Sequence, residues 1–379
     1  MMNHPVGISA LALSFPSVLR TNDHWRKKYP ELVTQAEQRT LAKLFSSTES
    51  TNKSSEFDLE MRPYLSDPFR GAVERRVLSP SESSLTLECR AAKDALDAAK
   101  LSPQNVDLTI VTSLFPEQIA PGNASFLVRE LGLQSPAWNL ESTCSSALVA
   151  LQTASALVRT GEYSNVLVVI SCIYSRFVDE DDTLSWFMGD GAGAFVVSAL
   201  KPDQGILGTK IVHTAATCGA FFNELTTDVR GNPRMRIQTG KNASKQIRDT
   251  GVEFVRKCSE DAVAAAGLTL DQIDFFAFNT PTAWYASLCT RALGIDSERT
   301  INLYPQYANI GPVLPIANLY YGAQMGKVRE NDLVLVYTIG SASTAAATVM
   351  RWGDVKLGPL PAPAVSSNQQ EDKVPLVAT

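Results

Sequence analysis

The chain has 379 residues, enough for two or three ordinary domains or for one large duplicated domain. Lysine and arginine total 34 against 39 aspartate and glutamate, so the formal net charge is −5, and 45% of the residues are hydrophobic. This composition excludes a protein that binds nucleic acid mainly by neutralising phosphates. No apolar run approaches the ~18 residues that span a bilayer, and the amino end lacks the basic flank of a signal peptide, so we expect a cytoplasmic protein without membrane association.

Cysteine and histidine are not spaced like the ligands of a metal site. The six cysteines form no C-x-x-C pair, and the three histidines, at positions 4, 24 and 213, form no H-x-x-x-H pair. We therefore expect neither a metal nor a disulfide framework. Glycine-rich phosphate-binding motifs are also lacking, which argues against nucleotide binding.

Two features of the amino-terminal third can be assigned from the pattern. Residues Ser46–Glu56 are a polar low-complexity stretch, and we expect an insertion loop over residues 46–70. Farther along, Lys93–Asp107 combines an alanine-rich helical stretch with a turn, and the apolar run Leu108–Val111 follows it. This order predicts a helix that leads into a buried strand.

The middle of the chain repeats this alternation more clearly. Ser145–Thr160 carries apolar residues at helical spacing, and Gly161 supplies a stop signal. The β-branched run Val166–Ile170 then predicts a strand that is covered on both faces. Alternating helices and doubly covered strands predict an α/β architecture.

An internal repeat is visible at one fixed offset in the numbering. Lys93–Asp107 aligns with Glu260–Asp274, where the offset is 274 − 107 = 167. Asn165–Ser171 aligns with Asp332–Thr338, and 332 − 165 is again 167. Two separate blocks that share one offset indicate a duplication of the whole unit.

The duplication predicts two sheets that share helices between them. We place the amino-terminal half at residues 1–205 and the carboxy-terminal half at residues 206–355. Residues 356–379 lack the apolar content of a core, so we expect a disordered tail there.

Cys144 lies directly before the helix predicted over Ser145–Thr160. A thiol at a helix start faces free backbone N–H groups and the positive end of the helix dipole, which lowers its pKa and favours the nucleophilic thiolate. Adding the offset gives 144 + 167 = 311, so the counterpart loop is Tyr307–Pro312, and Asn309 is expected to face Cys144. Without the duplication, a buried cysteine and a turn-forming asparagine would be the ordinary interpretations.

Four segments, in this order, resemble the landmarks of the ketoacyl-ACP synthase III branch of the thiolase-fold condensing enzymes. They are Thr143–Leu151 (TCSSALVAL), Phe187–Ala194 (FMGDGAGA), Tyr307–Gly311 (YANIG) and Tyr337–Ser341 (YTIGS). The resemblance covers nearly the whole chain and implies a thiolase fold, in which two duplicated α/β halves form a layered αβαβα core. It also implies a Cys-His-Asn site, with Cys144 acylated from a thioester and Asn309 as the asparagine.

The sequence departs from this pattern at the histidine. The strand Phe275–Phe278 should end on it, but Asn279 stands there. An asparagine amide can donate a hydrogen bond to an enolate oxygen but cannot accept a proton as imidazole does. The resemblance further implies that Ser341, in the place of a family glycine, forms an oxyanion hole with the N–H of Cys144. The resemblance also implies that the loop of Glu117 reaches the partner subunit, where Glu117 would act as a base. The alternative is that Glu117 is an ordinary solvated acid.

The expected function is therefore acyl transfer from Cys144 to a carbon nucleophile in a Claisen-type condensation. Two alternatives stay open: transfer to an amine or hydroxyl acceptor in secondary metabolism, and a catalytically silent partner subunit of a condensing enzyme. No tightly bound cofactor is implied, and an acyl-CoA or a phosphopantetheinyl acyl carrier protein would be the co-substrate. The resemblance also implies a homodimer, and we expect Asn165–Cys172 near its interface.

Overall fold

The structure is a computed structural model and describes residues 5–47, 55–228, 230–340 and 344–366. The described α-helices are α1 (Asn22–Lys28), α2 (Pro30–Ser47), α3 (Glu56–Met61), α4 (Ser84–Ala99), α5 (Asn123–Leu131), α6 (Ser146–Arg159), α7 (Ala243–Ala265), α8 (Tyr285–Leu293), α9 (Tyr304–Tyr307) and α10 (Val313–Gln324). The described strands are β1 (Val6–Ser14), β2 (Val18–Thr21), β3 (Glu74–Val77), β4 (Leu108–Leu114), β5 (Ala137–Asn139), β6 (Val166–Ile173), β7 (Asp190–Ala199), β8 (Gly205–His213), β9 (Phe221–Thr227), β10 (Pro233–Thr239), β11 (Phe275–Phe278), β12 (Leu333–Ile339), β13 (Thr344–Arg351), β14 (Lys356–Leu357) and β15 (Val365–Ser366).

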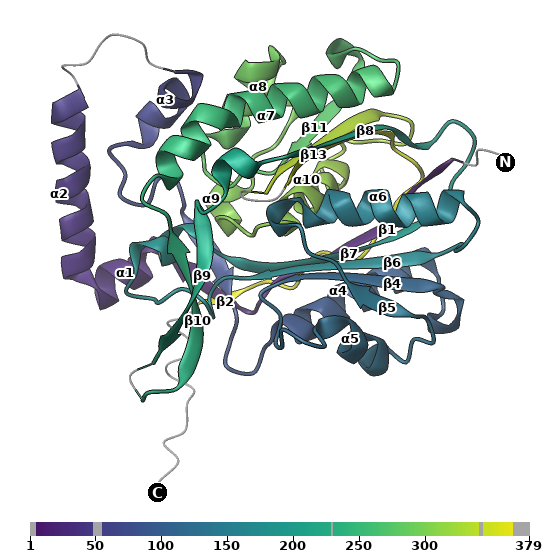
Figure 1. Cartoon of the computed structure of the whole chain (residues 1–379), viewed down its shortest axis with the longest axis horizontal. Coiled ribbons are helices and arrows are strands. Elements are labelled where there is room, and N and C mark those ends of the chain that lie inside the picture. Colours follow the sequence, from purple (N-terminus) through teal and green to yellow (C-terminus); the bar gives the residue numbers. More distant parts are fainter. Residues whose placement is uncertain (1–4, 48–54, 229, 341–343, 367–379) are drawn as a thin grey trace, which may run out of the picture.

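Two mixed sheets and three helical layers build the core of the molecule (Figure 1). The described residues form two smaller sheets as well, β10-β9 and β15-β2-β3. The first sheet has the strand order β14-β1-β7-β6-β4-β5, and the second has the order β11-β12-β13-β8. Helices α6 and α10 lie between the sheets, α4 and α5 cover the outer face of the first, and α7 and α8 cover the outer face of the second. This arrangement is the predicted layered αβαβα core of the thiolase fold.

The duplication is visible in the order and start of the elements. The strand pair β4 and β11 starts at positions 108 and 275, and the pair β6 and β12 starts at positions 166 and 333. The central helices α6 and α10 start at positions 146 and 313. All three pairs keep the offset found in the sequence, so these elements are counterparts. Each half thus supplies one sheet and one central helix, as the repeat predicts.

Strand β6 shows why the central positions are so apolar. All eight of its residues are buried, and it pairs with β7 on one side and with β4 on the other. Helices α6 and α4 cover its two faces, which explains the continuous β-branched run. Strand β6 therefore has no free edge or face for a partner to bind, and the expectation that Asn165–Cys172 lies near a dimer interface stays a prediction.

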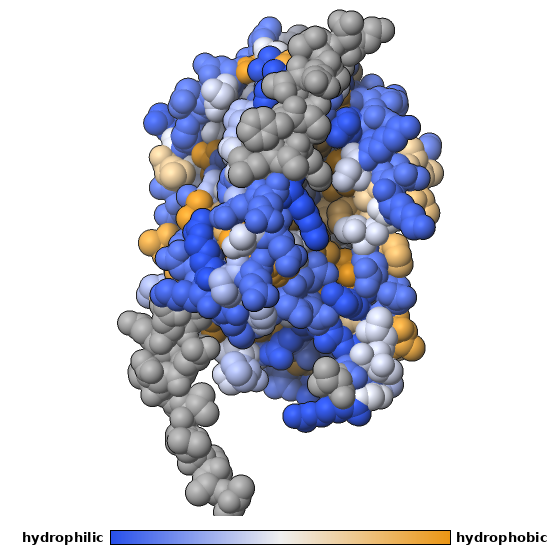
Figure 2. All heavy atoms as spheres, turned by 90° about the vertical axis from the view of Figure 1, so that its left-hand side faces the viewer, coloured by the Kyte–Doolittle hydropathy of each residue, from blue (hydrophilic) through white to orange (hydrophobic). Residues whose placement is uncertain are grey.

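Three helices occupy a region where the sequence analysis expected a loop or assigned nothing. Helix α3 (Glu56–Met61) lies inside residues 46–70, so that range is not simply a loop, and its start is fixed by a capping box of Ser55 and Asp58. Helices α1 and α2 precede it and bury Trp25 and Val33 in a small separate core. Figure 2 views the side of the molecule that carries α1 and α2, and its surface is mainly hydrophilic.

The expected disordered tail is ordered in its first part. Strand β14 pairs in parallel with β1, and β15 pairs in parallel with β2. The N–H of Gly358 also donates to the carbonyl of Leu11 at 2.8 Å. Backbone pairing to existing strands therefore holds residues 356–366, although most side chains of residues 356–364 are exposed or half-buried. Residues 367–379 lie outside the described part of the chain.

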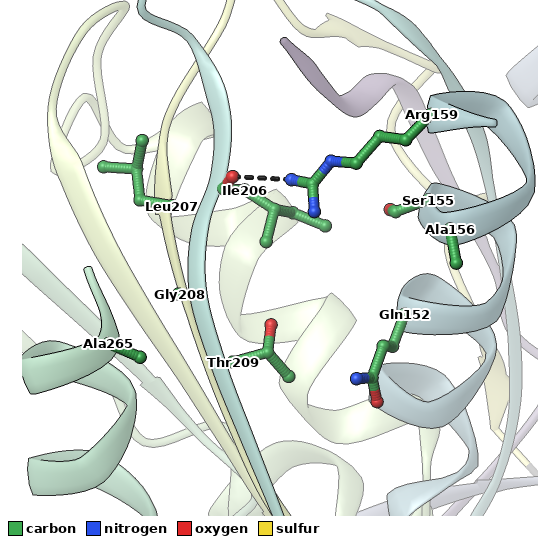
Figure 3. A pocket seen from close by; sticks show the side chains of 9 residues that line it. All are labelled: Gln152, Ser155, Ala156, Arg159, Ile206, Leu207, Gly208, Thr209 and Ala265. Atoms are coloured by element: carbon green, nitrogen blue, oxygen red, sulfur yellow. Dashed lines mark hydrogen bonds between the residues drawn. The ribbon is translucent and has the colours of Figure 1, made fainter. Parts of the chain in front are cut away.

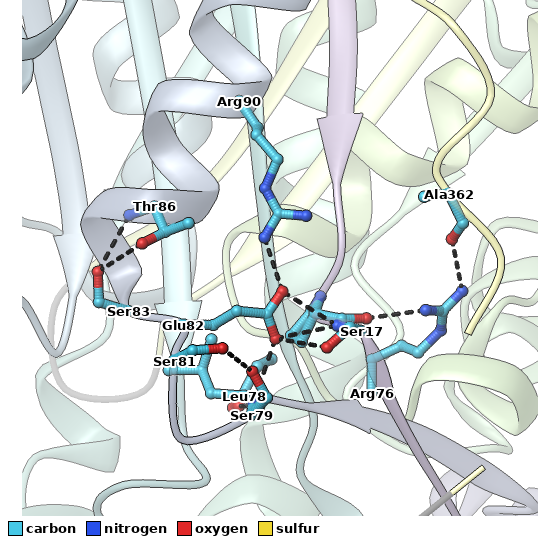
Figure 4. A network of polar contacts seen from close by, with 12 residues as sticks. Ser17, Arg76, Leu78, Ser79, Ser81, Glu82, Ser83, Thr86, Arg90 and Ala362 are labelled. Carbon is cyan, nitrogen blue, oxygen red and sulfur yellow. Dashed lines mark hydrogen bonds and ion pairs between the residues drawn. The ribbon is translucent and has the colours of Figure 1, made fainter. Parts of the chain in front are cut away.

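A polar cluster around Glu82 joins the connection between β1 and β2 to the start of α4 (Figure 4). The carboxylate accepts hydrogen bonds from the N–H and the hydroxyl of Ser17 and from the N–H of Ser79, and it pairs with Arg90 at 2.7 Å. Burial alone would raise the pKa of Glu82, but these donors favour the charged form and lower its pKa to about 2.

The fold should therefore lose stability in acid when Glu82 is protonated. The folded-state pKa lies below the unfolded value, so this stabilisation is complete above about pH 4.5 and fades as the pH falls toward 2. We expect Glu82→Gln to lower the free energy of unfolding by about 2 kcal/mol at pH 7, the scale of hydrogen bonds to a charged group. In urea unfolding, the difference from wild type should shrink at pH 3. Glu298→Gln, at a carboxylate with 86% of its side chain exposed, is the control and should change little. An equal loss at both pH values would contradict this account.

Candidate active site

The turn that carries Cys144 is a 3₁₀ turn, Thr143–Ser145, which leads directly into α6. Thr143 has a φ of 47°, in the left-handed region that β-branched residues avoid. Gly340 of the other half approaches this turn so closely that a Cβ there would lie 2.1 Å from the Thr143 hydroxyl oxygen. The nucleophile turn thus combines an unusual backbone conformation with a close approach that leaves no room for a side chain at position 340.

Hydrogen bonds fix the same turn to strand β13. The Ser145 hydroxyl donates to the carbonyl of Thr344 at 2.7 Å, and the hydroxyls of Ser142 and Thr344 lie 2.8 Å apart. Ser142 also donates its N–H to the hydroxyl of Ser146. Because Thr344 belongs to the second half of the chain, the position of Cys144 depends on both halves.

The loop of Asn309 is held to the first half in a comparable way. The N–H of Asn309 donates to the carbonyl of Phe187 at 2.9 Å, and the N–H of Gly189 donates to the carbonyl of Asn309 at 3.0 Å. A Cβ at Gly189 would lie 2.3 Å from the carbonyl oxygen of Tyr307. The Asn309 side-chain oxygen accepts from the N–H of Gly311 at 2.8 Å, which fixes the orientation of the amide.

Cys144 and Asn309 line one cavity of about 240 Å³, so the structure brings these two predicted residues together. The remaining walls are mostly apolar and come from both halves of the chain. They are formed by Phe57, Leu114, Phe115, Thr143, Tyr174, Met188, Phe221, Phe222, Asn223, Ile237, Ile247, Pro281, Thr282, Tyr285 and Ile339. A cavity of this kind suits an acyl chain or another extended apolar group.

Figure 3 shows a second cavity, of about 320 Å³, between α6 and β8. Ser155 and Arg159 of α6 and Thr209 of β8 line it, and Arg159 donates to the carbonyl of Ile206. None of the site residues expected from the sequence lines this cavity, so we do not assign the site to it.

Tyr174 is a site residue that the sequence analysis missed. It follows β6 directly, is 6% exposed, and places its hydroxyl 3.9 Å from the sulfur of Cys144. The same hydroxyl contacts the thiol of Cys172, the buried residue two positions earlier. A tyrosine at the end of a buried strand was visible in the sequence, but nothing there placed it beside a residue 30 positions away.

The expected low pKa of Cys144 is wrong for the free protein. Burial raises the pKa of this thiol to about 11, and the charge of Glu141 acts in the same direction. The contact with Tyr174 lowers the pKa but does not offset the burial. The thiol is therefore mostly protonated at neutral pH, and a helix start alone does not make it a thiolate.

Asn279 lies at the carboxyl end of β11, where its N–H donates to the carbonyl of Tyr337 at 2.8 Å. Its side chain is fully buried, and neither the amide nitrogen nor the amide oxygen has a hydrogen-bond partner. Buried amides are normally satisfied, because an unpaired one costs about 1–3 kcal/mol. Asn279 does not line the cavity, although Pro281 and Thr282 of the following turn do.

The other candidate residues lie elsewhere. The carboxylate of Glu117 accepts from the N–H of Ser84 at 2.8 Å, at the start of α4 in its own chain. Ser341 lies outside the described residues. Neither described histidine lines the cavity: His24 pairs with Glu180, and His213 is exposed at the end of β8.

Comparison with known families follows the two halves of the chain. Residues 138–215 match the family model for 3-oxoacyl-[acyl-carrier-protein] synthase III, and residues 263–352 match its carboxy-terminal counterpart. Residues 72–170 match the amino-terminal domain of thiolase. The β-ketoacyl-[acyl-carrier-protein] synthase III of Rhizorhabdus wittichii is 30% identical over 288 residues, which cover 74% of this chain and 88% of that protein. The chain belongs to the 3-oxoacyl-[acyl-carrier-protein] synthase III family of condensing enzymes.

Solved structures show the same fold at lower identity. The priming β-ketosynthase of the R1128 polyketide pathway is 19% identical with a TM-score of 0.76, over 93% of this chain and 97% of that one. The OleA protein of Xanthomonas campestris, crystallised with lauric acid and lauroyl-CoA, is 18% identical with a TM-score of 0.73, over 93% and 100%.

The raised pKa of Cys144 predicts a particular pH dependence of alkylation. Iodoacetamide reacts with the thiolate, so the rate at Cys144 should rise about tenfold per pH unit from pH 7 to pH 10. Peptide-resolved mass spectrometry after timed alkylation would measure this rate separately from the exposed Cys218. A rate at Cys144 that reaches its plateau below pH 8.5 would show a thiolate at neutral pH and contradict the assignment.

Proposed function

We propose that the protein is an acyltransferase that takes an acyl group from a thioester onto Cys144 and passes it to a carbon nucleophile. The observation that carries this proposal is the shared cavity: Cys144, at the head of a central helix, and Asn309, from the counterpart loop, line one mainly apolar space. Membership of a condensing-enzyme family supports the reaction class.

Condensation with a malonyl-type thioester suits the site better than acylation of an alcohol. Loss of carbon dioxide generates the carbanion without an external base, whereas an alcohol must give up a proton to one. The enolate oxygen needs hydrogen-bond donors, and the amide of Asn279 is a buried donor without a partner in the free protein. We therefore propose Asn279, which does not line the cavity in the free protein, as the donor to this oxygen, and Asn309, which does line it, as the asparagine beside Cys144. The roles of Ser341 as a donor in the oxyanion hole and of Glu117 as a base for the partner subunit stay predictions.

The co-substrate proposed is an acyl-CoA or an acyl group on a phosphopantetheinyl carrier protein, without a tightly bound cofactor. The apolar walls of the cavity match an acyl chain, and the related OleA protein binds lauroyl-CoA.

Among the described residues no group of three or more histidine, cysteine or acidic side chains is arranged to hold a metal ion. No described helix is long and apolar enough to cross a membrane.

We also propose that the protein is a homodimer whose protomers are divided into halves at residues 1–205 and 206–355. Strand β5 is at the edge of the first sheet, and Trp138 on it is 37% exposed. A sheet edge can pair with another strand, so β5 is a better candidate for the interface than the interior strand β6.

Acylation of Cys144 is the most direct test of the proposed function. We expect incubation with a panel of acyl-CoA and acyl-carrier-protein thioesters to add one acyl group, detected by intact-protein mass spectrometry, and peptide mapping to place it on Cys144. Cys144→Ala should abolish the adduct, whereas Cys218→Ala, which removes an exposed thiol outside the cavity, should leave it unchanged. An adduct on another cysteine, or one that persists in Cys144→Ala, would overturn the assignment.

Substitutions at Asn279 should separate the two half-reactions. If its amide stabilises the developing oxyanion, Asn279→Ala should slow the transfer step by about 10²-fold or more, the effect of one lost donor. Asn279→Asp should be at least as damaging, because it places an acceptor-only charge beside that oxygen. Asn279→His restores a base and should increase decarboxylation of malonyl thioesters. Acylation of Cys144 should change much less in all three variants, and unchanged turnover in Asn279→Ala would remove the donor role.

A further inference from the structure

We propose that Tyr174 is a catalytic residue of this site and that its hydroxyl relays a proton from the Cys144 thiol to the departing thiol during acylation. This inference rests on the proposed function, because it describes how the acyl group is transferred to Cys144. It begins from a contact: the Tyr174 hydroxyl lies 3.9 Å from the sulfur of Cys144, within hydrogen-bonding range for sulfur.

The phenol ring is held firmly in this position. Its centroid lies 5.5 Å from that of Phe115, which in turn lies 4.6 Å from that of Phe177. The carbonyl of Tyr174 accepts hydrogen bonds from the N–H groups of Phe177 and Val178 at 2.9 and 3.1 Å. The residue also follows β6 directly, a strand buried on both faces. A hydroxyl on so constrained a ring returns to the same place beside Cys144 after each turnover.

The site offers few other groups for moving this proton. The described histidines lie outside the cavity, and an asparagine amide cannot accept a proton in the place of imidazole. The Glu141 carboxylate is exposed and accepts from the N–H of Thr143 in the nucleophile turn. Cys172 is a buried thiol that contacts the same tyrosine, and Asp190 acts on Cys172 rather than on Cys144. Tyr174 lines the same cavity and has its hydroxyl in contact with the Cys144 sulfur, so we assign the proton transfer to it.

Burial makes a neutral relay preferable to free ions. It raises the pKa of the Cys144 thiol to about 11 and that of the Tyr174 phenol well above its usual range. Forming either the thiolate or the phenolate in advance is thus unfavourable at neutral pH. A hydroxyl that accepts one proton while it donates another requires neither charge.

The proposed step is balanced in atoms and charge. The sulfur of Cys144 forms a bond to the acyl carbon as the bond from that carbon to the donor sulfur breaks. The thiol proton of Cys144 passes to the oxygen of Tyr174, and the phenolic proton of Tyr174 passes to the departing sulfur. The products are the acylated Cys144, a free thiol and a neutral tyrosine, so the step consumes no external base.

The leaving thiol provides a test that a structural role would not pass. Hexanoyl-CoA releases an alkyl thiol that needs a proton, whereas a hexanoyl thioester of thionitrobenzoate releases an aromatic thiolate of low pKa that does not. Tyr174→Phe retains the ring and removes only the hydroxyl. We expect it to slow acylation of Cys144 by hexanoyl-CoA by about 10²-fold or more, the scale of acid–base catalysis, and to slow acylation by the thionitrobenzoate ester by only about tenfold. With that ester the variant still lacks the acceptor of the thiol proton, but the leaving sulfur needs no proton.

Tyr320→Phe is the matched control. Tyr320 is a buried tyrosine of α10 whose hydroxyl donates to the carbonyls of Gly358 and Pro359 at 2.9 Å, and it does not line the cavity. The Tyr320→Phe substitution should leave the acylation rates with both thioesters unchanged. Equal losses for the two thioesters in Tyr174→Phe, or no loss with hexanoyl-CoA, would overturn the relay while leaving acylation of Cys144 intact. Failure of wild type to accept the acyl group from either thioester would instead count against the proposed function itself.

Discussion

Hydrogen bonds between the Asn309 loop and the Phe187–Gly189 segment hold the two halves of the chain together at the cavity. On the other side of the site, Thr344 of β13 holds the nucleophile turn through the hydroxyls of Ser142 and Ser145. Neither half can position its own residue alone, because each loop is fixed by groups from the other half. The site is thus a product of the duplication: counterpart loops at the starts of the two central helices meet across the internal symmetry.

The site contains few charged groups, and this determines which reaction steps it favours. Its walls are mostly apolar, its thiol is mostly protonated at neutral pH, and neither described histidine lines it. Steps that keep groups neutral are therefore easier here than steps that need a free thiolate or an imidazolium. Decarboxylative condensation forms the carbon nucleophile without a protein base. The proposed relay through the Tyr174 hydroxyl likewise moves the proton of the Cys144 thiol without forming a free thiolate. In the proposed reaction, the buried amide of Asn279, which has no hydrogen-bond partner in the free protein, stabilises the negative enolate oxygen.

Periodicity and the repeat were sufficient to predict two sheets that share helices, because β6 and α6 carry their burial pattern in the sequence itself. The layered αβαβα order was implied by the resemblance to the condensing enzymes. Helices α1 and α2 were not predicted, since the small core around Trp25 and Val33 depends on tertiary contacts. The strands of residues 356–366 were missed because backbone pairing, which leaves no apolar pattern, orders them. The predicted direction of the Cys144 pKa shift was wrong, since a sequence shows that a cysteine precedes a helix but not how far the surrounding residues shield its thiol from water.

A crystal structure of the acylated enzyme would test whether the cavity between the two halves is the site of acyl transfer. We expect density continuous with the sulfur of Cys144, an acyl chain against the apolar walls of that cavity, and the amide of Asn279 or Asn309 within hydrogen-bonding distance of the acyl oxygen. An acyl chain in the cavity between α6 and β8, or a thioester on another cysteine with Cys144 unmodified, would contradict it.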